Sequence, residues 1–320
     1  MQENDCNNLK SELAESVKRN YTDALLLSGG LDSSILANIV NPRYSWTIAF
    51  GNDAMDLSFA RTVAAKYSKK HTEVILTNVE LLNIIKEIIK LFKTFDPIEI
   101  RNSSVMYAGL SKAREEGIST IMTGDGGDEL FAGYNYLKRY FFNIQMLKAE
   151  LQRLWDTMHF SSRIIGRNLG MNVKTPFLDN KFICYAKSID IVKLIGEHLN
   201  DWWGKFILRK CYEQEIGNEI VWRPKQAQEQ GAGVINIRDL LIKNLDDGSY
   251  KQNTTKALSE GVIIKDKEQL YYYSIFRMYF SPPKEEECLS VRCPKCNCCF
   301  KWRGSFCRTC GSFPVEPREV

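Results

Sequence analysis

Two glycine-rich segments, each directly after a short apolar run, constrain the fold most strongly. The run Asp23–Ser28 is followed by Gly29-Gly30, and the run Ile118–Thr123 leads into Gly124-Asp-Gly-Gly-Asp128. Short apolar runs bounded by turn residues are typical of buried strands. The chain therefore contains at least two buried strands that each end in a polar, glycine-rich turn.

Helical patterns alternate with these strands and with two others. The predicted strands are Asp23–Ser28, Tyr44–Phe50, His71–Leu76 and Ile118–Thr123. The predicted helices are Leu9–Val17, Ser33–Val40, Asp56–Ser68, Val79–Phe92 and about Ser103–Glu116. This alternation predicts an α/β fold, a parallel sheet with helices on both faces. We expect a five-stranded sheet, of which these four strands are the ones located by pattern. Because ligands bind beyond the carboxyl ends of such strands, both glycine-rich turns lie at the binding edge.

Composition divides the rest of the chain. We predict a lead and helix over 1–20, a main domain over 21–280 whose second half is mainly helical, a linker over 281–290 and a zinc ribbon over 291–313. The linker is indicated by Ser281-Pro-Pro-Lys-Glu-Glu-Glu287, a double proline followed by like charges. From Cys288 onward there are six basic and two acidic side chains, so the whole net charge of +4 lies in this tail.

The composition also excludes some classes of protein. Apolar residues make up 44% of the chain and charged residues 26%, ordinary values for a globular protein and unlike a disordered chain. No run of 18 apolar residues could span a membrane, and the polar N-terminus does not resemble a secretory signal. We therefore predict a cytoplasmic protein that does not associate with membranes.

The first turn, Ser28-Gly-Gly-Leu-Asp-Ser-Ser34, has the chemistry of an anion site. Small residues let backbone N–H groups approach a phosphate, and the following helix N-terminus adds positive charge. Asp32 would repel phosphate unless a cation lay between them, which indicates Mg²⁺. The simpler interpretation is an ordinary strand-turn-helix with a capping aspartate.

The second turn, Thr123-Gly-Asp-Gly-Gly-Asp-Glu-Leu-Phe-Ala-Gly-Tyr134, gathers three carboxylates among glycines. These carboxylates would repel one another without a cation. Asp128 suits a second Mg²⁺ ligand opposite Asp32. Asp125 could position a nucleophile or accept its proton. The simpler interpretation of a Gly-Asp-Gly segment is a turn without function.

Together these motifs resemble the synthetase domain of the asparagine synthetase family over roughly residues 20–280. The first turn alone resembles the pyrophosphatase loop of adenylate-forming enzymes. Further matching segments are Lys174-Thr-Pro-Phe-Leu-Asp179, Lys205-Phe-Ile-Leu-Arg209, Trp222-Arg-Pro-Lys225 and Gly231-Ala-Gly233, together with Asp56, Asp96, Arg101 and Tyr107. The resemblance implies an adenine nucleotide alpha-hydrolase-like fold and an AMP-forming carbon–nitrogen ligase that uses ATP and Mg²⁺.

The resemblance also implies a nucleotide site. The residues that would hold pyrophosphate and Mg²⁺ are Ser28, Gly29, Gly30, Asp32, Ser33 and Ser34. Leu27, Ile48 and Gly124 would contact the adenosine part, and Asp128 would complete the metal site.

Three residues would act in catalysis. By the resemblance, Asp125 occupies the acidic position linked to acyl transfer. Lys225 would reach the phosphates and neutralise charge on the leaving pyrophosphate, with Lys205 close behind it. For both lysines the alternative is a solvated side chain without a catalytic role.

Two departures from the family affect the substrates. About twenty residues precede the first strand, and Cys6 lies in a polar lead, so we expect no glutaminase domain with an N-terminal cysteine nucleophile. The nitrogen would then come from free ammonia, a separate glutaminase or another amine donor. The family often has an acidic residue and an arginine before Pro-Phe-Leu-Asp, whereas this chain has Asn172-Val-Lys174. The small carboxylate acceptor, aspartate or a similar acid, is therefore left open.

Seven of the ten cysteines lie in the tail. Cys293 and Cys296 form one C-x-x-C pair, and Cys307 and Cys310 form another, which is the spacing of a structural zinc site. Disulfides are the alternative, which a cytoplasmic chain disfavours. Cys298 and Cys299 could compete as ligands, and Cys288 is predicted to be spare. The basic, aromatic segment Phe300–Phe306 suits either base stacking on RNA or packing on the body.

The leading functional hypothesis is an ATP-dependent amide-forming synthetase that adenylates a carboxylate and transfers ammonia or an amine. The alternative is a tRNA-modifying ATP pyrophosphatase that adenylates a base while the zinc ribbon holds tRNA. A third possibility is a non-catalytic nucleotide-binding protein, against which Asp32, Asp128 and Lys225 argue.

Overall fold

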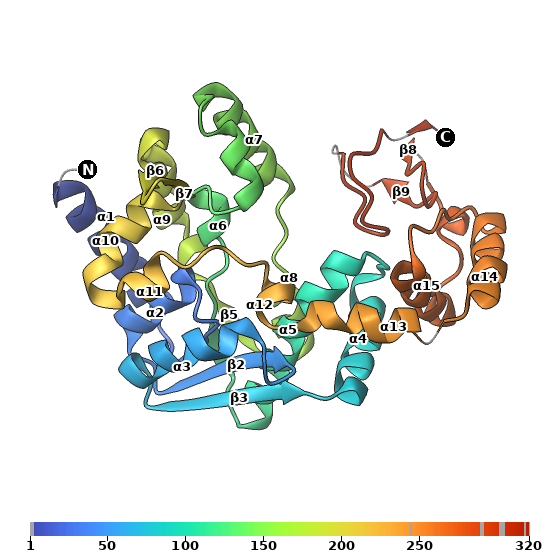
Figure 1. Cartoon of the computed structure of the whole chain (residues 1–320), viewed down its shortest axis with the longest axis horizontal. Coiled ribbons are helices and arrows are strands. Elements are labelled where there is room, and N and C mark those ends of the chain that lie inside the picture. The colour runs from blue at the N-terminus through green and yellow to red at the C-terminus, as the bar shows by residue number, and fades with distance from the viewer. Residues whose placement is uncertain (1–2, 244, 289–290, 301–304, 317, 320) are drawn as a thin grey trace. The chain divides into compact units, whose positions relative to one another are not determined.

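The computed structural model describes residues 3–243, 245–288, 291–300, 305–316 and 318–319 (Figure 1). The chain forms two compact units. The first contains residues 1–75 and 108–227, and the second contains residues 76–107 and 228–320. The domain boundaries predicted from composition remain a prediction.

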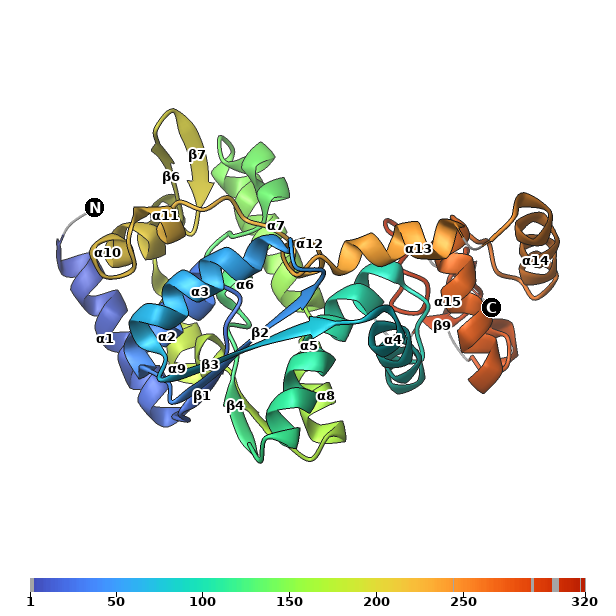
Figure 2. The ribbon, with the colours of Figure 1, turned by 60° about the horizontal axis from the view of Figure 1, so that its bottom comes forward.

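A parallel five-stranded sheet lies at the centre of the first unit, which confirms the predicted fold class. Its strands are β1 (Ala24–Leu26), β2 (Tyr44–Phe50), β3 (Lys70–Leu76), β4 (Thr120–Met122) and β5 (Asn172–Lys174). Their spatial order is β3-β2-β1-β4-β5, so β1 lies at the centre of the sheet. Figure 2 labels β1 to β4 of this sheet. The central strand β1 and its neighbour β4 each lead into one of the glycine-rich turns.

Helices connect and surround these strands. Those of the first unit are α1 (Glu3–Arg19), α2 (Leu31–Val40), α3 (Met55–Tyr67), α6 (Gly127–Leu130), α7 (Ile144–Thr157), α8 (Ser161–Asn168), α9 (Asn180–Ser188), α10 (Phe206–Ile216) and α11 (Asn218–Val221). A hairpin of β6 (Ile195–His198) and β7 (Asp201–Gly204) precedes α10. Helix α5 (Pro97–Glu115) begins in the second unit and ends in the first.

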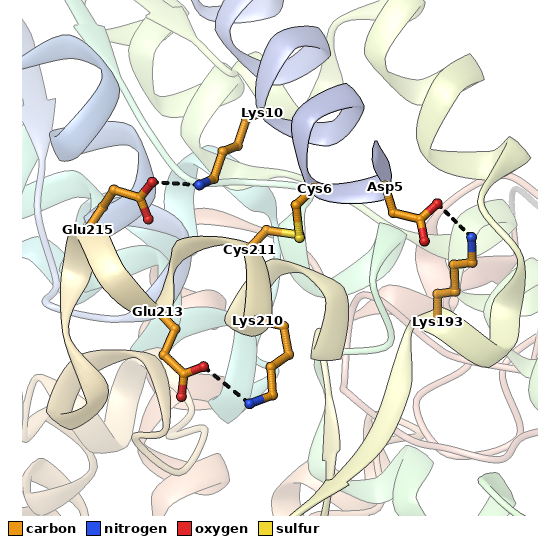
Figure 3. The surroundings of a disulfide bond; sticks show 8 residues. All are labelled: Asp5, Cys6, Lys10, Lys193, Lys210, Cys211, Glu213 and Glu215. Carbon is orange, nitrogen blue, oxygen red and sulfur yellow. Dashed lines mark hydrogen bonds and ion pairs between the residues drawn. A yellow bond between two sulfur atoms is a disulfide. The ribbon is translucent and has the colours of Figure 1, made fainter. Parts of the chain in front are cut away.

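Helix α1 is fixed to the first unit by packing and by covalent chemistry. Its Leu9 and Leu13 side chains are fully buried in the unit's hydrophobic core. A disulfide joins Cys6 to Cys211 on α10 across 205 positions of sequence (Figure 3). The Lys10 ammonium lies 2.5 Å from a Glu215 carboxylate oxygen beside this bond. Helix α1 is therefore part of the first unit.

The second unit is mainly helical. Its helices are α4 (Asn78–Phe92), the first part of α5, α12 (Gln228–Gly231), α13 (Ile237–Lys243), α14 (Asp247–Ser259) and α15 (Lys267–Tyr279). Thr77 and Glu80 form a capping box that starts α4. Phe95, in the α4–α5 loop, is fully buried and makes edge-to-face contacts with Tyr273 and Phe276 of α15. None of the helices that the structure describes is long and apolar enough to cross a membrane.

The cysteine-rich tail forms a small antiparallel sheet within the second unit. Its strands are β8 (Val291–Arg292), β9 (Cys299–Phe300) and β10 (Arg318–Glu319), in the order β10-β8-β9. Cys293, Cys296, Cys307 and Cys310 are buried free thiols that lie together, which is compatible with the predicted zinc ribbon.

Candidate active site

The first glycine-rich turn connects β1 to the N-terminus of α2. The Ser28 and Ser33 hydroxyl oxygens lie 3.1 Å apart, and the Ser33 hydroxyl also donates to the Gly30 carbonyl at 3.1 Å. Gly29 has a φ of +67°, and a Cβ there would lie 2.4 Å from the Ala60 amide nitrogen. Only glycine fits this position, so the turn can approach a ligand with bare backbone.

Two buried oxygens of α2 have no hydrogen-bond partner among the described residues. They are the Ser34 hydroxyl and one carboxylate oxygen of Asp32, Oδ1. A buried polar atom without a partner costs free energy, and such atoms are often completed by a ligand or an ion. The positive N-terminus of α2 and these free oxygens therefore mark a polar site that is ready for a ligand.

Lys205 joins the two glycine-rich turns. Its ammonium nitrogen lies 2.5 Å from Asp32 Oδ2 and 2.7 Å from Asp128 Oδ1. The Lys205 side chain is 4% exposed, against 14% for Asp32 and 13% for Asp128. The sequence indicated a positive charge between these two carboxylates, and the Lys205 ammonium group provides one.

Lys225 contacts the same cluster from another side. Its ammonium nitrogen lies 2.6 Å from Asp128 Oδ2, so Asp128 forms ion pairs with both lysines. Burial alone would raise the pKa of Asp128, but the ammonium groups of Lys205 and Lys225 outweigh it and hold the pKa below its usual range. Burial outweighs the opposing charge of Lys205 at Asp32, so the pKa of Asp32 is raised. Sequence reasoning placed Lys205 behind Lys225, whereas the structure places it between the two carboxylates.

The backbone around Lys205 is held in an uncommon conformation. Lys205 has a φ of +54°, and its amide donates to the Phe131 carbonyl at 2.7 Å. A Cβ on Gly204 would lie 1.9 Å from the Ala132 carbonyl oxygen. A left-handed conformation costs free energy for lysine, and it persists here because the segment after the second turn fixes it. This conformation places the side chain between the aspartates.

Lys225 is positioned by two buried arginines. Arg223 donates to Asp56 at 2.6 Å and to the Gly29 carbonyl at 3.4 Å, which ties the lysine's segment to the first turn. Arg209, on α10, donates to the Arg223 carbonyl at 3.2 Å and to the Val221 carbonyl. The arginines of the Lys205–Arg209 and Trp222–Lys225 segments therefore support the two lysines.

Asp125 lies on the other side of the second turn. One of its carboxylate oxygens accepts from the Thr123 hydroxyl at 3.1 Å and from the Ser162 hydroxyl at the start of α8. Burial raises the pKa of Asp125 and outweighs the opposing hydrogen bonds from Ser162 and Thr123. A carboxylate with a raised pKa is suited to accepting a proton. Among the described residues, Asp125 has no ion pair with either lysine, so it forms a separate part of the site.

Leu27 directly follows β1, and Ile48 lies near the C-terminal end of the neighbouring strand β2. Both side chains are buried, and the Leu27 amide donates to the Trp46 carbonyl at 2.8 Å. Gly124 is close to the first turn, because a Cβ there would lie 3.1 Å from the Asp32 Cβ and 3.3 Å from the Ser33 amide. The residues predicted to contact adenosine thus flank the same strand edge as the polar cluster.

Comparison with known proteins assigns the family. A family model described as asparagine synthase matches residues 8–166 and 144–280, most of the chain. This chain belongs to the asparagine synthase family. The match ends at residue 280, so the cysteine-rich tail lies outside it.

Curated relatives agree with this assignment. Asparagine synthetase B (glutamine-hydrolyzing) of Escherichia coli strain K12 is 29% identical over 90% of this chain and 57% of that protein. Asparagine synthetase (glutamine-hydrolyzing) 2 of Oryza sativa subsp. japonica is 29% identical over 86% of this chain and 50% of that protein. For asparagine synthetase (glutamine-hydrolyzing) of Gallus gallus the identity is 29%, over 80% and 48% respectively. The chain spans about half the length of the curated relatives it matches.

Within this asparagine synthase-family site, sequence reasoning did not single out Glu129. Burial and the neighbouring Asp128 carboxylate together raise its pKa to about 7, against a hydrogen bond from the Tyr134 hydroxyl at 2.6 Å. Glu129 follows Asp128 directly in the motif, which was the available signal. The partner Tyr134 could not be assigned without the fold, because the second turn has to curl before the two side chains meet.

The structure tests only some of the predictions made for the cysteine-rich tail. Cys288, predicted to be spare, is joined to Cys299 by a disulfide, and Cys298 is a buried free thiol. Lys301, Trp302 and Arg303, which were the basis of the RNA hypothesis, lie outside the described residues. Neither the family match nor the names of the relatives support that hypothesis.

Proposed function

We propose that this chain is an ATP-dependent carbon–nitrogen ligase that adenylates a small carboxylate and transfers ammonia or an amine to it, releasing AMP and pyrophosphate. One observation carries this proposal. The buried Lys205, the partly exposed Lys225 and two aspartates converge where the β1–α2 turn meets the β4–α6 turn. A site that must bind a polyphosphate and neutralise a pyrophosphate leaving group needs this arrangement.

The protein's own groups suit ATP. Backbone amides of the Ser28–Gly30 turn and the N-terminus of α2 would bind the β- and γ-phosphates, with the buried Ser34 hydroxyl as a further donor. The Ser28 and Gly30 amides would exchange their present hydrogen bonds to the Ser33 and Ser28 hydroxyls for the phosphate. Lys225 is 30% exposed on its side chain, against 4% for Lys205, so Lys225 would swing to the phosphates while Lys205 stays between the aspartates. The ammonium groups would stabilise charge on the departing pyrophosphate.

The residues present also fit Mg²⁺. Oxygen atoms of carboxylates are the ligands that this ion prefers, and Asp32 Oδ1 is buried without a partner among the described residues. Asp32 and Asp128 would hold the ion, and Asp128 stays ionised because its pKa lies below the usual range. When bound, Mg²⁺ would neutralise phosphate charge and orient the polyphosphate.

Asp125 suits the second half-reaction. An incoming ammonium ion or amine must lose protons before it can form an amide, and Asp125 would position it and accept a proton. Its two hydroxyl donors, Thr123 and Ser162, fix the carboxylate in place. We propose aspartate or a similar acid as the acceptor, and free ammonia or a separate amine donor as the nitrogen source. Zn²⁺ in the cysteine cluster would take no part in this chemistry.

The test is ATP–pyrophosphate exchange with the purified chain. We expect exchange in the presence of aspartate or a related carboxylate, and no exchange when bulk tRNA is the only added acceptor. Asp128→Asn should reduce exchange about 100-fold or more, because it removes a metal ligand and a partner of both lysines. Asp201→Asn, at an exposed aspartate paired with Lys138, is the matched control and should exchange normally.

Three outcomes would contradict the proposal. One is near-normal exchange by Asp128→Asn at saturating Mg²⁺. Another is exchange that depends on tRNA rather than on a carboxylate. The third is adenylation without any amide product when ammonium or an amine is supplied.

A further inference from the structure

The two C-x-x-C turns of the tail share one backbone geometry. The residue after each second cysteine is left-handed, with φ of +58° at Asn297 and +72° at Gly311. The amide of each donates back to the first cysteine's carbonyl, from Asn297 to Cys293 at 2.8 Å and from Gly311 to Cys307 at 2.7 Å. Two segments that are unrelated in sequence outside the cysteines thus form the same tight turn.

The four sulfur atoms have the spacing of a tetrahedral metal site. Cys293 Sγ lies 3.8 Å from Cys310 Sγ, and Cys296 Sγ lies 3.7 Å from Cys307 Sγ. Thiolates bound about 2.3 Å from a tetrahedral zinc ion lie about 3.8 Å from one another. All four side chains are buried, and all four sulfurs lie within 4.8 Å of one another.

The first cysteine turn, Cys293–Cys296, is attached to the α14–α15 connection. The Ile263 amide donates to the Lys295 carbonyl at 2.8 Å. The Asn297 side-chain amide donates to the Gly261 carbonyl at 2.6 Å. One backbone bond and one side-chain bond thus join this cysteine turn to backbone of the helical body.

The second cysteine turn, Cys307–Cys310, is attached to the α4–α5 loop and to α15. The Phe95 amide donates to the Thr309 carbonyl at 2.8 Å, and the Gln269 side-chain amide donates to the Cys310 carbonyl at 2.7 Å. Gly311 lies directly against Asp96, because a Cβ there would be 2.2 Å from an Asp96 carboxylate oxygen. Phe95 and Gln269 are almost completely buried, so their amides would lack partners if this turn lost its shape.

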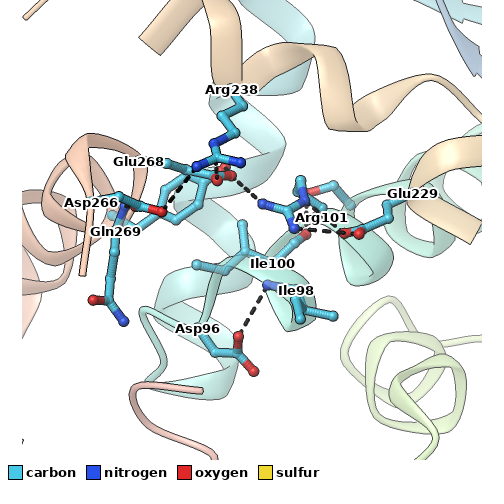
Figure 4. A network of polar contacts seen from close by, with 11 residues as sticks. Asp96, Ile98, Ile100, Arg101, Glu229, Arg238, Asp266, Glu268 and Gln269 are labelled. Atoms are coloured by element: carbon cyan, nitrogen blue, oxygen red, sulfur yellow. Dashed lines mark hydrogen bonds and ion pairs between the residues drawn. The ribbon is translucent and has the colours of Figure 1, made fainter. Parts of the chain in front are cut away.

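Beside Gln269, a buried charge network begins. Glu268 accepts from Arg101 at 2.5 Å, and Arg101 also donates to Glu229 of α12 at 2.6 Å (Figure 4). These three side chains come from α15, α5 and α12, and all are less than a tenth exposed. The cysteine turns therefore adjoin the network that connects the helices of the second unit.

We propose that Cys293, Cys296, Cys307 and Cys310 hold one structural Zn²⁺ ion, and that this ion is a folding cofactor of the whole second unit rather than of the tail alone. A module of this size has too little core to fold by itself, so the ion supplies the free energy that shapes both turns. The shaped turns then provide the carbonyls that Phe95, Ile263 and Gln269 require. The proposal does not depend on the ATP chemistry.

The test combines metal content with hydrogen exchange on the full chain. Elemental analysis should find one zinc per chain in the wild type and none in Cys310→Ser. Two matched controls, Cys298→Ser at the neighbouring buried thiol and Cys184→Ser at an exposed thiol on α9, should keep one zinc. The Phe95 and Ile263 amides should exchange at least tenfold faster in Cys310→Ser and normally in both controls.

Because Cys310→Ser could misfold for other reasons, the same two amides are also followed in the wild type during zinc removal by a chelator and zinc return. Protection should fall and then recover. A wild-type protein without zinc, or a zinc ion retained by Cys310→Ser, would overturn the site. Zinc loss that leaves Phe95 and Ile263 protected would overturn the role in the second unit.

Discussion

Lys205 offers the most demanding test of the electrostatics of the site. Replacing it by methionine keeps the length of the side chain and removes the ammonium group that lies between Asp32 and Asp128. Breaking a buried ion pair by removing one partner typically costs about 3–5 kcal/mol of the free energy of unfolding, because the remaining charges are left uncompensated. We expect Lys205→Met to fall in this range.

The cost should depend on pH in a defined direction. Burial already raises the pKa of Asp32 above its usual value, and Lys205 is the largest opposing influence, so its removal raises this pKa further. A carboxyl whose folded-state pKa exceeds its unfolded value contributes stability that is fully present below the unfolded pKa, near 4, and is lost as the pH rises. Asp128 also loses a partner that keeps it ionised. The deficit of the variant should therefore be larger at pH 8 than at pH 5.

The assay is urea unfolding followed by tryptophan fluorescence at these two pH values. Five of the six tryptophans belong to the first unit, so the signal reports on the unit that contains Lys205. Lys10→Met is the matched control, because Lys10 pairs with Glu215 at the surface, where the two side chains are 34% and 36% exposed. It should cost about 1 kcal/mol or less. Equal costs for the two variants, or a deficit that shrinks as the pH rises, would refute the reasoning.

Two further predictions concern stability. Burial raises the pKa of Asp96 to about 7, so the unfolding free energy of the second unit should decline between about pH 4 and pH 7, by up to about 4 kcal/mol. The side chain of Asp96→Asn can still accept from the Ile98 amide. In urea unfolding followed by circular dichroism, this variant should show a flatter decline of stability with pH. A wild-type stability that does not change over this pH range would contradict the prediction. Removing the Cys6–Cys211 disulfide by Cys6→Ser should cost the oxidised protein up to about 5 kcal/mol, because the bond closes a long loop in the unfolded chain. In Cys6→Ser a reductant has no Cys6–Cys211 bond left to break. Cys184→Ser is the control variant. An unchanged urea midpoint in Cys6→Ser would count against the prediction.

Local sequence patterns located most elements of the sheet. The apolar run Tyr44–Phe50 coincides with β2, and the predicted helix Val79–Phe92 differs from α4 by one residue at its start. These elements are long enough for a helical or strand pattern to be recognised. The fifth strand was expected but could not be located, because β5 has only three residues, Asn172–Lys174. Its place is set by pairing with β4, which no local pattern records.

The cysteine pairs illustrate the same limit. The four predicted zinc ligands were identifiable because each pair is local, with two residues between its cysteines. The Cys6–Cys211 pair was not, because its partners are 205 positions apart and meet only when α1 packs on α10.

The sequence by itself determined the chemistry that this chain can offer: glycine-rich turns after strands, aspartates and hydroxyls within them, and four cysteines in two short pairs. Residue identity and local spacing suffice for that, since backbone freedom, charge and metal preference are properties of the residues. Only the tertiary structure decided that Lys205, rather than Lys225, lies between Asp32 and Asp128, and that the Cys307–Cys310 turn is bonded to the α4–α5 loop. The first depends on the left-handed backbone at Lys205. Both depend on contacts between distant segments, which form only when burial forces each polar group to find a partner.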